Sequence, residues 1–186
     1  MILKMIVSGC AVMCAFTANA ETLTGSGLPM KFGIGYGVMV NEESSLEREW
    51  VVVNDDKLPV KITQFKGSNI FLDDRTWTYK NHYKIEVAEP ISAIEVRFIP
   101  FDIWGEKGRT LSSTEVRDFV SGSYDQDGTW RILSENEATE HFAMVAYVAQ
   151  VKLSSGAVLR ADTEAVVSEA QKFSAEFTSG DLSVAE

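Results

Sequence analysis

Apolar and polar residues alternate with a period of two along much of this chain. Ile94, Val96 and Phe98 are separated by Glu95 and Arg97, which is the pattern of a strand with one buried face. Further short apolar runs, separated by turn-forming residues, occur at 31–40, 50–53, 60–65, 77–87 and 142–159. Short strands with a turn about every ten residues predict a mostly β fold. We expect one domain, an immunoglobulin-like antiparallel β-sandwich spanning residues 31–161.

Residues 142–151 are apolar on both faces of the predicted strand. One face would consist of Phe142, Met144, Ala146 and Val148, and the other of Ala143, Val145, Tyr147, Ala149 and Val151. Both faces must therefore be covered. We expect the sandwich core on one side and the C-terminal helix on the other, with a loop or a second subunit as alternatives to the helix. The segment Ser154–Gly156 then predicts a hairpin loop.

The last part of the chain changes to a helical period. Its apolar residues recur at spacings of four, three and four, at Val166, Ala170, Phe173 and Phe177. This spacing predicts an amphipathic helix over residues 162–178, with Asp162 as the N-cap. Residues 179–186 are predicted to form a disordered tail, and residues 21–30 an N-terminal arm.

The first twenty residues have the layout of a secretory signal peptide. Lys4 gives a positive start, Met5–Phe16 is an apolar run, and Ala18 and Ala20 are small residues of the kind a signal peptidase recognises. The apolar run is too short to span a bilayer. We therefore expect cleavage near Ala20 and a periplasmic or secreted protein. The alternative is lipid attachment at Cys10, because the residues before it resemble a lipobox.

Cleavage would change the chemistry available to the protein. Both cysteines, Cys10 and Cys14, lie in the signal segment, so the mature chain would have no thiol nucleophile, thiolate metal site or disulfide. Loss of Lys4 would change the formal net charge from −10 to −11, which disfavours nucleic acid and anionic membranes as partners. No apolar run after residue 20 approaches the ~18 residues of a membrane span. The chain has no Asn-x-Ser/Thr glycosylation signal, which favours a bacterial envelope.

Residues 101–119, FDIWGEKGRTLSSTEVRDF, contain a dense group of acidic and aromatic side chains. Two glycines near its start supply the backbone freedom that a tight turn needs, and carboxylates in such turns commonly accept backbone N–H bonds. We therefore interpret the first half of this stretch as a turn between two strands. The candidate ligand-binding residues of this turn are Asp102, Trp104, Glu106 and Arg109.

The same region resembles small bacterial immunoglobulin-like modules of the FxLYD type. The resemblance is carried by Phe98, Phe101, Asp102, Gly105, Gly108 and Leu111, which follow the spacing of their strand–turn–strand core. The segment Trp50–Asn54, with Pro59 after it, is similar to their opening strand and turn, so the resemblance covers residues 50–112. It implies an immunoglobulin-like sandwich with a role in adhesion or assembly, and it implies no catalytic residues.

A carboxylate-dependent hydrolase is the alternative interpretation of residues 101–119. Two carboxylates among Asp102, Glu106, Glu115 and Asp118 would have to face one substrate bond, about 5–9 Å apart. Such an enzyme would act on an envelope or extracellular polymer. The two interpretations differ in geometry, because a hydrolase needs these carboxylates in one cleft and a turn does not.

Metal and cofactor motifs are weak in this sequence. Asp125 and Asp127 precede a glycine as in a calcium loop, but the position that requires a bidentate glutamate is Ser134, so an Asp-Gly turn is the preferred interpretation. His82 and His141 lack the HExxH spacing of zinc hydrolases. No phosphate-binding loop is present, and the glycines at 33, 35 and 37 precede no helical pattern. We therefore predict no cofactor and no metal.

These observations favour a non-catalytic binding or assembly module of the bacterial envelope. Its partner would be another exported protein or a glycan, held through exposed strand edges or aromatic loops. The hydrolase is the second hypothesis, and a calcium-dependent binder using Asp125 and Asp127 is a third.

Overall fold

The computed structural model describes residues 20–29, 47–73, 76–131 and 141–184. Nearly all of the predicted signal segment, including Cys10, and the strand predicted at 31–40 lie outside these residues. Within the described ranges, no helix is both long and apolar enough to cross a membrane.

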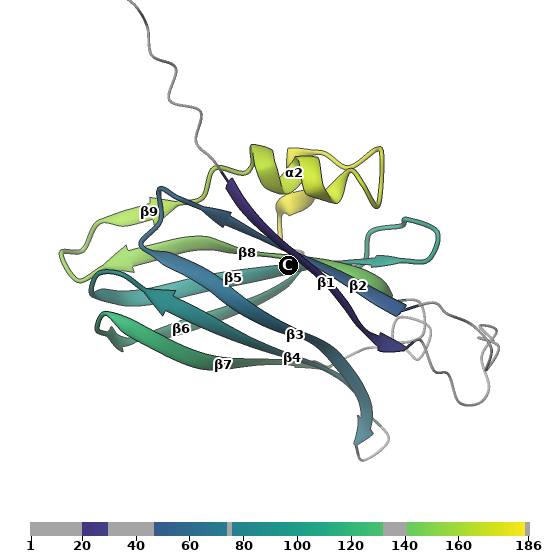
Figure 1. Ribbon diagram of the computed structural model, residues 1–186, viewed down its shortest axis with the longest axis horizontal. Helices are drawn as coiled ribbons and strands as arrows, with labels where there is room; N and C mark the ends of the chain where they lie inside the picture. Colours follow the sequence, from purple (N-terminus) through teal and green to yellow (C-terminus); the bar gives the residue numbers. More distant parts are fainter. Residues whose placement is uncertain (1–19, 30–46, 74–75, 132–140, 185–186) are drawn as a thin grey trace, which may run out of the picture.

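Two β-sheets lie face to face as a sandwich (Figure 1). The larger sheet has the strand order β1 (Ala20–Pro29), β2 (Glu47–Asp55), β8 (His141–Leu153), β5 (Ile91–Asp102) and β6 (Leu111–Phe119), with β9 (Val158–Arg160) also paired to β8. The smaller sheet has the order β3 (Val60–Asp73), β4 (Thr76–Val87) and β7 (Gly122–Arg131). The predicted mostly β sandwich is therefore confirmed.

Two details of the sheets differ from the expectation. The strands β2 and β8 pair in parallel, whereas the other pairs in the described ranges are antiparallel. Residues 21–30 were expected to be an arm outside the sandwich, but almost all of them belong to β1, which pairs with β2 along its length. Thr22, Leu23 and Thr24 alternate between polar and apolar, as the residues of an edge strand do. This short pattern did not predict a strand, and the segment forms one because it pairs with β2.

The space between the sheets is filled by an aromatic cluster around Phe98 of β5. Its ring centroid lies 6.0 Å from that of Phe65, 5.4 Å from Tyr83 and 5.2 Å from Trp130, which belong to the three strands of the smaller sheet. Aromatic contacts of this kind add to the free energy gained from burial alone. One side chain of the larger sheet thus contacts every strand of the smaller one.

The central strand β8 is buried on both faces, as predicted. Met144, Ala146 and Val148 point towards the smaller sheet, and Ala143, Val145 and Tyr147 towards the C-terminal segment. The prediction is wrong at the two ends, because Val151 lies in the inter-sheet core and Phe142 packs with the C-terminal layer. The register with β5 shifts at three places, and two of these shifts, between Val148 and Gln150 and between His141 and Ala143, lie in β8. Each of these two shifts places an extra residue in β8, and an extra residue reverses the alternation of faces.

The C-terminal helix is present but much shorter than predicted. The helix α2 spans Glu164–Ala170 rather than 162–178. Thr163, not Asp162, is its N-cap residue, although Asp162 Oδ1 accepts a hydrogen bond from the Glu164 N–H (3.2 Å). Beyond α2 the chain continues in turns across the larger sheet (Figure 1).

The apolar side chains of this segment nevertheless reach the surface they were expected to cover. Val166, Ala170 and Phe177 are buried against the outer face of the larger sheet, and Phe173 is partly buried there. The helical spacing therefore identified the residues that pack on the sheet. Phe173 and Phe177 reach it from turns rather than from a helix. Spacings of three and four fit both, because a turn also returns the chain to the same face after three or four residues.

The tail predicted to be disordered is folded as far as the described residues extend. Ser179–Leu182 form the 3₁₀ helix η1, and the Leu182 side chain is buried in the outer layer. Arg97 Nη1 donates a hydrogen bond to the Leu182 carbonyl (3.1 Å). A single leucine and one accepted hydrogen bond thus attach the tail to β5.

Asn54 joins the two sheets where the chain passes from β2 to β3. Its side-chain Nδ2 donates to the Ile62 carbonyl (2.9 Å), and its Oδ1 accepts from the Ile62 N–H (2.8 Å). Both residues are buried, so water cannot replace these bonds. The amide of Asn54 therefore takes the place of a neighbouring strand for one residue of β3.

We expect the substitution Asn54→Ala to lower the free energy of unfolding by about 2–4 kcal/mol, because it leaves the buried N–H and C=O of Ile62 without partners. Urea denaturation measures the change. The matched control is Thr63→Ala, which removes only a long, exposed hydrogen bond to the Lys84 carbonyl and should cost less than about 0.5 kcal/mol. Equal losses in the two variants would contradict this role of Asn54.

Candidate functional site

The turn predicted after β5 is present and is held by its own aspartate. Asp102 Oδ1 accepts hydrogen bonds from the backbone N–H groups of Trp104 (2.8 Å) and Glu106 (2.7 Å). The Asp102 N–H donates to the Glu106 carbonyl (3.0 Å), and the Gly105 N–H donates to the Asp102 carbonyl (3.2 Å). This is the usual behaviour of an aspartate that begins a turn. The interpretation of this stretch as a turn is confirmed.

The C-terminal segment supports the turn from behind. Gly105 has a φ of +82°, and a Cβ at this position would lie 2.4 Å from the Phe173 carbonyl oxygen. Only glycine combines this backbone angle with so close an approach. The Phe173 ring stacks on Phe101, with the centroids 5.5 Å apart. The turn is therefore wedged between β5 and the residues that follow α2.

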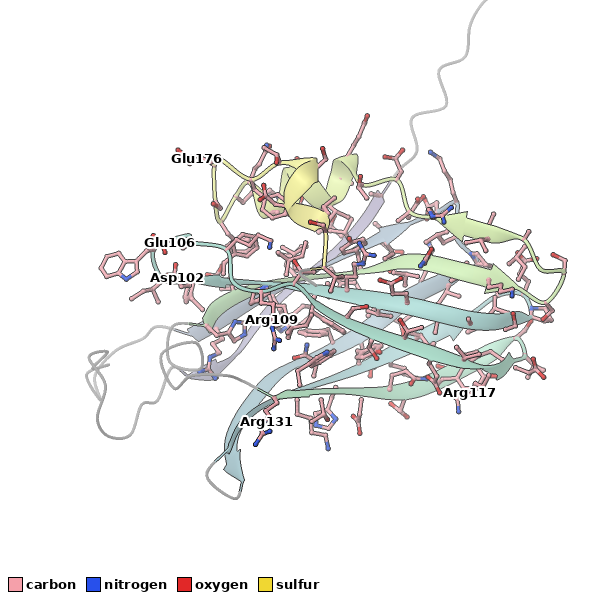
Figure 2. All side chains as sticks on the ribbon, turned by 180° about the vertical axis from the view of Figure 1, so that it is seen from behind. Asp102, Glu106, Arg109, Arg117, Arg131 and Glu176 are labelled. Carbon is pink, nitrogen blue, oxygen red and sulfur yellow. The ribbon has the colours of Figure 1, made fainter. Side chains whose placement is uncertain are left out.

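Trp104 projects from this fixed turn into solvent. Its exposed fraction is 80%, the largest of the exposed large apolar side chains. Asp102, Glu106 and Glu176 lie at the same end of the molecule (Figure 2). A tryptophan held outside the fold by a rigid backbone loses little conformational entropy when it contacts a partner, and tryptophan is enriched among the residues that dominate binding energy.

A cleft of about 640 Å³ opens beside the turn. Its walls come from β1, β2, the start of β8, the turn after β5, and α2 with the residues that follow it. The lining residues are Thr24, Gly25, Glu49, Trp50, Val51, Asp102, Ile103, Gly105, Phe142, Glu169, Lys172 and Phe173. Ligand pockets in proteins commonly measure ~300–1,000 Å³, so this cleft has room for a side chain or a short segment of a ligand.

Three partly buried aromatic residues form the apolar part of the cleft. They are Trp50, Phe142 and Phe173, and Val51 and Ile103 complete the apolar lining. The indole of Trp50 lies directly over Gly25, where a Cβ would come within 2.3 Å of its Cζ2 atom. Trp50 also contacts Phe65 edge-on, with centroids 5.5 Å apart. Glycine on β1 thus creates the space in which this tryptophan packs.

The charged residues of the cleft are mainly acidic. Lys172 Nζ lies 2.7 Å from both carboxylate oxygens of Glu169, so these two charges compensate each other. Glu49 and Asp102 form no ion pair among the described residues. The cleft therefore combines aromatic walls with an uncompensated negative charge, which favours positively charged groups.

Only part of the predicted set of binding residues surrounds this cleft. Asp102 lines it, and Trp104 and Glu106 belong to the adjoining turn. Arg109 lies beyond the turn, and its Nη2 atom donates to the Arg131 carbonyl of β7 (3.1 Å). Figure 2 shows Arg109 and Arg131 on the side of the molecule away from Glu176. The arginine is thus directed towards the smaller sheet.

The carboxylates required by the hydrolase hypothesis do not meet in the cleft. Of the four, only Asp102 lines it, and one of its oxygens is already bonded to two backbone N–H groups. Glu115 is paired with Arg117 at 2.8 Å on β6, and Asp118 is exposed on the same strand. Arg117 lies at the opposite end of the molecule from Asp102 (Figure 2).

The other two acidic residues of the cleft were not predicted. The spacing of Glu169 and Lys172 on one turn of helix indicates that they are neighbours, but nothing in the sequence places them near Asp102. Glu49 carries no local signal, because its position depends on how β2 pairs with β1 and β8. The site is assembled by long-range contacts.

The calcium-loop hypothesis and the preferred Asp-Gly turn are both wrong. Asp125 and Asp127 lie on strand β7, opposite Lys84 and His82 of β4. Asp127 pairs with His82 and with Lys80 (3.8 Å). Acidic side chains of β7 thus lie opposite basic side chains of β4. In the described part of the chain, no group of three or more metal-ligating side chains is present.

Glu95 is a buried carboxylate that the sequence did not identify. It accepts hydrogen bonds from Arg97 Nε (2.6 Å), Gln150 Nε2 (2.6 Å) and Ser112 Oγ (3.1 Å). Burial raises the pKa of Glu95, but the bonds from Arg97 and Gln150 outweigh this effect, so the net change is downward. These bonds come from β5, β6 and β8. Glu95 therefore connects neighbouring strands.

His141 is buried at the start of β8 and is neutral. Burial lowers its pKa to about 3, and the positive charge of Arg48 acts in the same direction. Arg48 Nε also donates to the His141 carbonyl (3.1 Å), which connects the starts of β2 and β8. His82, by contrast, is partly exposed on the smaller sheet.

No family model, curated protein or solved structure matches this chain. The resemblance of residues 50–112 to FxLYD-type modules therefore stays a prediction, and the function has to be argued from the site itself.

We expect Gly105→Ala to destabilise the protein more than Gly156→Ala. Gly156 also has a positive φ, of 93°, but no atom lies within 4 Å of a Cβ placed there. Its substitution should cost about 1–2 kcal/mol for the backbone conformation alone. Gly105→Ala should cost at least ~1 kcal/mol more, because the Cβ overlaps the Phe173 carbonyl. Urea denaturation of both variants tests this difference, and equal losses would show that the turn is not packed against the C-terminal segment.

We expect stability to fall between pH 7 and pH 5 in a way that depends on His141. The folded state holds this side chain neutral down to a pKa of about 3, whereas the unfolded chain protonates it near 6.5. The unfolded state therefore binds more protons in this range, and stability decreases as the pH falls, by about 2 kcal/mol from this group. The variant His141→Gln should lose that dependence, and the control His82→Gln should keep it. Identical pH profiles for His141→Gln and the unmodified chain would contradict the assignment.

Proposed function

We propose that this protein is an exported, non-catalytic binding module that holds a basic segment of a partner protein at the cleft beside Trp104. The single observation that carries the proposal is the arrangement at this end of the sandwich. An exposed tryptophan on a fixed turn adjoins a cleft that is aromatic and acidic. Export is supported by the signal-peptide pattern of residues 1–20.

The composition of the cleft favours a polypeptide with lysine or arginine side chains. An ammonium or guanidinium group is attracted both to the face of an aromatic ring and to a nearby carboxylate. Trp50, Phe173 and Asp102 offer these two features within one cleft. The negative net charge of the whole chain would also speed the encounter with a basic partner. A glycan, which also stacks on aromatic rings, is the alternative partner that the experiment must distinguish.

The rigidity of the turn suits binding rather than catalysis. One carboxylate oxygen of Asp102 accepts hydrogen bonds from two backbone N–H groups, and Gly105 packs closely against the Phe173 carbonyl oxygen. A surface that is already ordered loses less entropy on association. The hydrolase hypothesis has no comparable support, because its four carboxylates are distributed between the turn and β6.

A photo-crosslinking amino acid at Glu106 tests the proposal in the native compartment. We expect it to capture a partner through a segment rich in lysine or arginine, and the capture should disappear in the variant Trp104→Ala. The same crosslinker at Ser155, in the turn between β8 and β9, is the control and should capture nothing in common. Capture of a glycan instead would change the partner class, and identical products from both positions would reject the cleft as the binding site.

Binding measurements with a peptide made from the captured segment separate the contributions. Trp104→Ala should weaken binding by about 2 kcal/mol, or roughly thirtyfold, whereas Trp104→Phe should retain part of the affinity. Glu49→Gln should weaken binding mainly at low salt, because it removes one uncompensated charge. If Asp102→Asn abolished a hydrolytic activity while the fold remained, the enzyme hypothesis would replace this one.

A further inference from the structure

The strand β6 forms one edge of the larger sheet. It pairs with β5 on one side, and no strand in the described ranges pairs with its other side. Exposed strand edges attract other strands, because their backbone N–H and C=O groups lack partners. The strand β6 spans nine residues, Leu111–Phe119, so a second strand could pair with it over several residues.

An exposed apolar side chain lies in the middle of this edge. Val116 has an exposed fraction of 77%, the second largest among the large apolar residues after Trp104. Val120, just beyond the strand, is 66% exposed. The opposite edge, β1, has no exposed large apolar residue among those described. Among the described large apolar residues of the larger sheet, Val116 is thus more exposed than Val158 of β9, whose exposed fraction is 46%.

The backbone of β6 presents alternate residues to this edge. The Ser112 carbonyl accepts a hydrogen bond from the indole Nε1 of Trp130 on β7 (3.0 Å), so it is directed away from β5. Because backbone groups alternate in direction along a regular antiparallel strand, Thr114 and Val116 direct theirs the same way, as far as the register shift that follows Val116.

We infer that β6 is a homodimer interface, at which β6 of a second copy of this chain pairs in antiparallel orientation. In a symmetric pair centred on Val116, this valine lies opposite its own counterpart. Glu115 then lies opposite Arg117 of the second copy, and Arg117 opposite Glu115. In this one register, the central valines contact each other and both glutamate–arginine pairs have opposite charges.

The charges select this register over its neighbours. Both copies keep the same face towards the same side of the joined sheet, so the register can shift only by two residues at a time. A shift in one direction centres the pair on Glu115, which places two glutamates opposite each other. A shift in the other direction centres it on Arg117 and places two arginines opposite each other. Like charges directly opposite one another destabilise a strand pair.

The side chains at these positions are available for such contacts. Glu115 and Arg117 have side-chain exposed fractions of 33% and 47%, and they pair with each other at 2.8 Å within one chain. The Arg117 guanidinium lies 4.4 Å from the centre of the Phe119 ring, which holds it near the strand. In the dimer, the same two side chains can exchange partners between copies. This surface is separate from the cleft, because Arg117 and Asp102 lie at opposite ends of the molecule (Figure 2).

Sedimentation velocity over a range of protein concentrations tests the interface, using the protein expressed from the 186-residue sequence. We expect a monomer–dimer equilibrium for the unmodified chain. Glu115→Arg or Arg117→Glu alone should raise the dissociation constant about tenfold, because each places like charges opposite each other twice in the dimer. The double variant E115R/R117E should restore dimerisation, because it exchanges the two signs.

A mixture of the two single variants gives the sharper result. Glu115→Arg leaves two arginines on its edge, and Arg117→Glu leaves two glutamates, so the mixed dimer is complementary while neither parent is. We expect the mixture to dimerise more tightly than either variant alone.

Valine variants supply the matched control and keep the test informative if the charge variants lose stability. Val116→Lys should weaken the dimer, and Val158→Lys, at an exposed valine of β9, should not. A monomer at every concentration, or a dimer unaffected by these substitutions at β6, would overturn the inference. Thermal unfolding of each variant confirms that the monomer is folded.

Discussion

The larger sheet is buried on both faces, and this constraint places the other parts of the structure. Its central strand β8 has apolar residues on both sides, so one layer must cover each. The smaller sheet covers the inner face, where its aromatic residues pack around Phe98 of β5. The outer face is covered by α2, the turns that follow it and η1. Without the outer layer, Val145 and Tyr147 would be exposed in the middle of a flat apolar surface.

The candidate site is a consequence of this second layer. The outer layer ends where β5 ends, and there the Phe173 carbonyl meets Gly105 while the Phe173 ring meets Phe101. The cleft is the space left between this contact and residues 24–25 of β1 and 49–51 of β2. Its shape is therefore fixed by packing that also stabilises the fold, and Trp104 is displayed by a turn that has little freedom to move.

The sequence predicted those features that depend on local pattern. Alternation identified parts of β2, β3, β4, β5 and β8 but missed β1 and β7, and the aspartate and glycines after β5 identified the turn. The features that it missed depend on contacts between distant segments. The faces of Phe142 and Val151 are set by bulges opposite β5, which no alternation within β8 can reveal. The length of α2 was overestimated because turns can also return Phe173 and Phe177 to the sheet. Asp125 and Asp127 resemble a turn by composition, and only their pairing with β4 places them in a strand. Glu49 and Glu169 reach the cleft through pairing and packing that no local motif encodes.

The parallel pair of β2 and β8 has a consequence for the order in which this protein can fold. Trp50 lies opposite Met144, so β2, near the start of the chain, cannot complete its pairing until β8, near the end, is available. A chain that emerges with its N-terminus first can pair β1 with β2, but an isolated hairpin is only marginally stable in water. Val51 and Val53, which belong to the outer layer, stay uncovered until β8 and α2 follow. Non-local pairing of this kind slows folding and leaves apolar strands open to wrong partners. A nascent chain therefore keeps these strands exposed until β8 has been made, and the residues from His141 onward complete the larger sheet as well as the cleft.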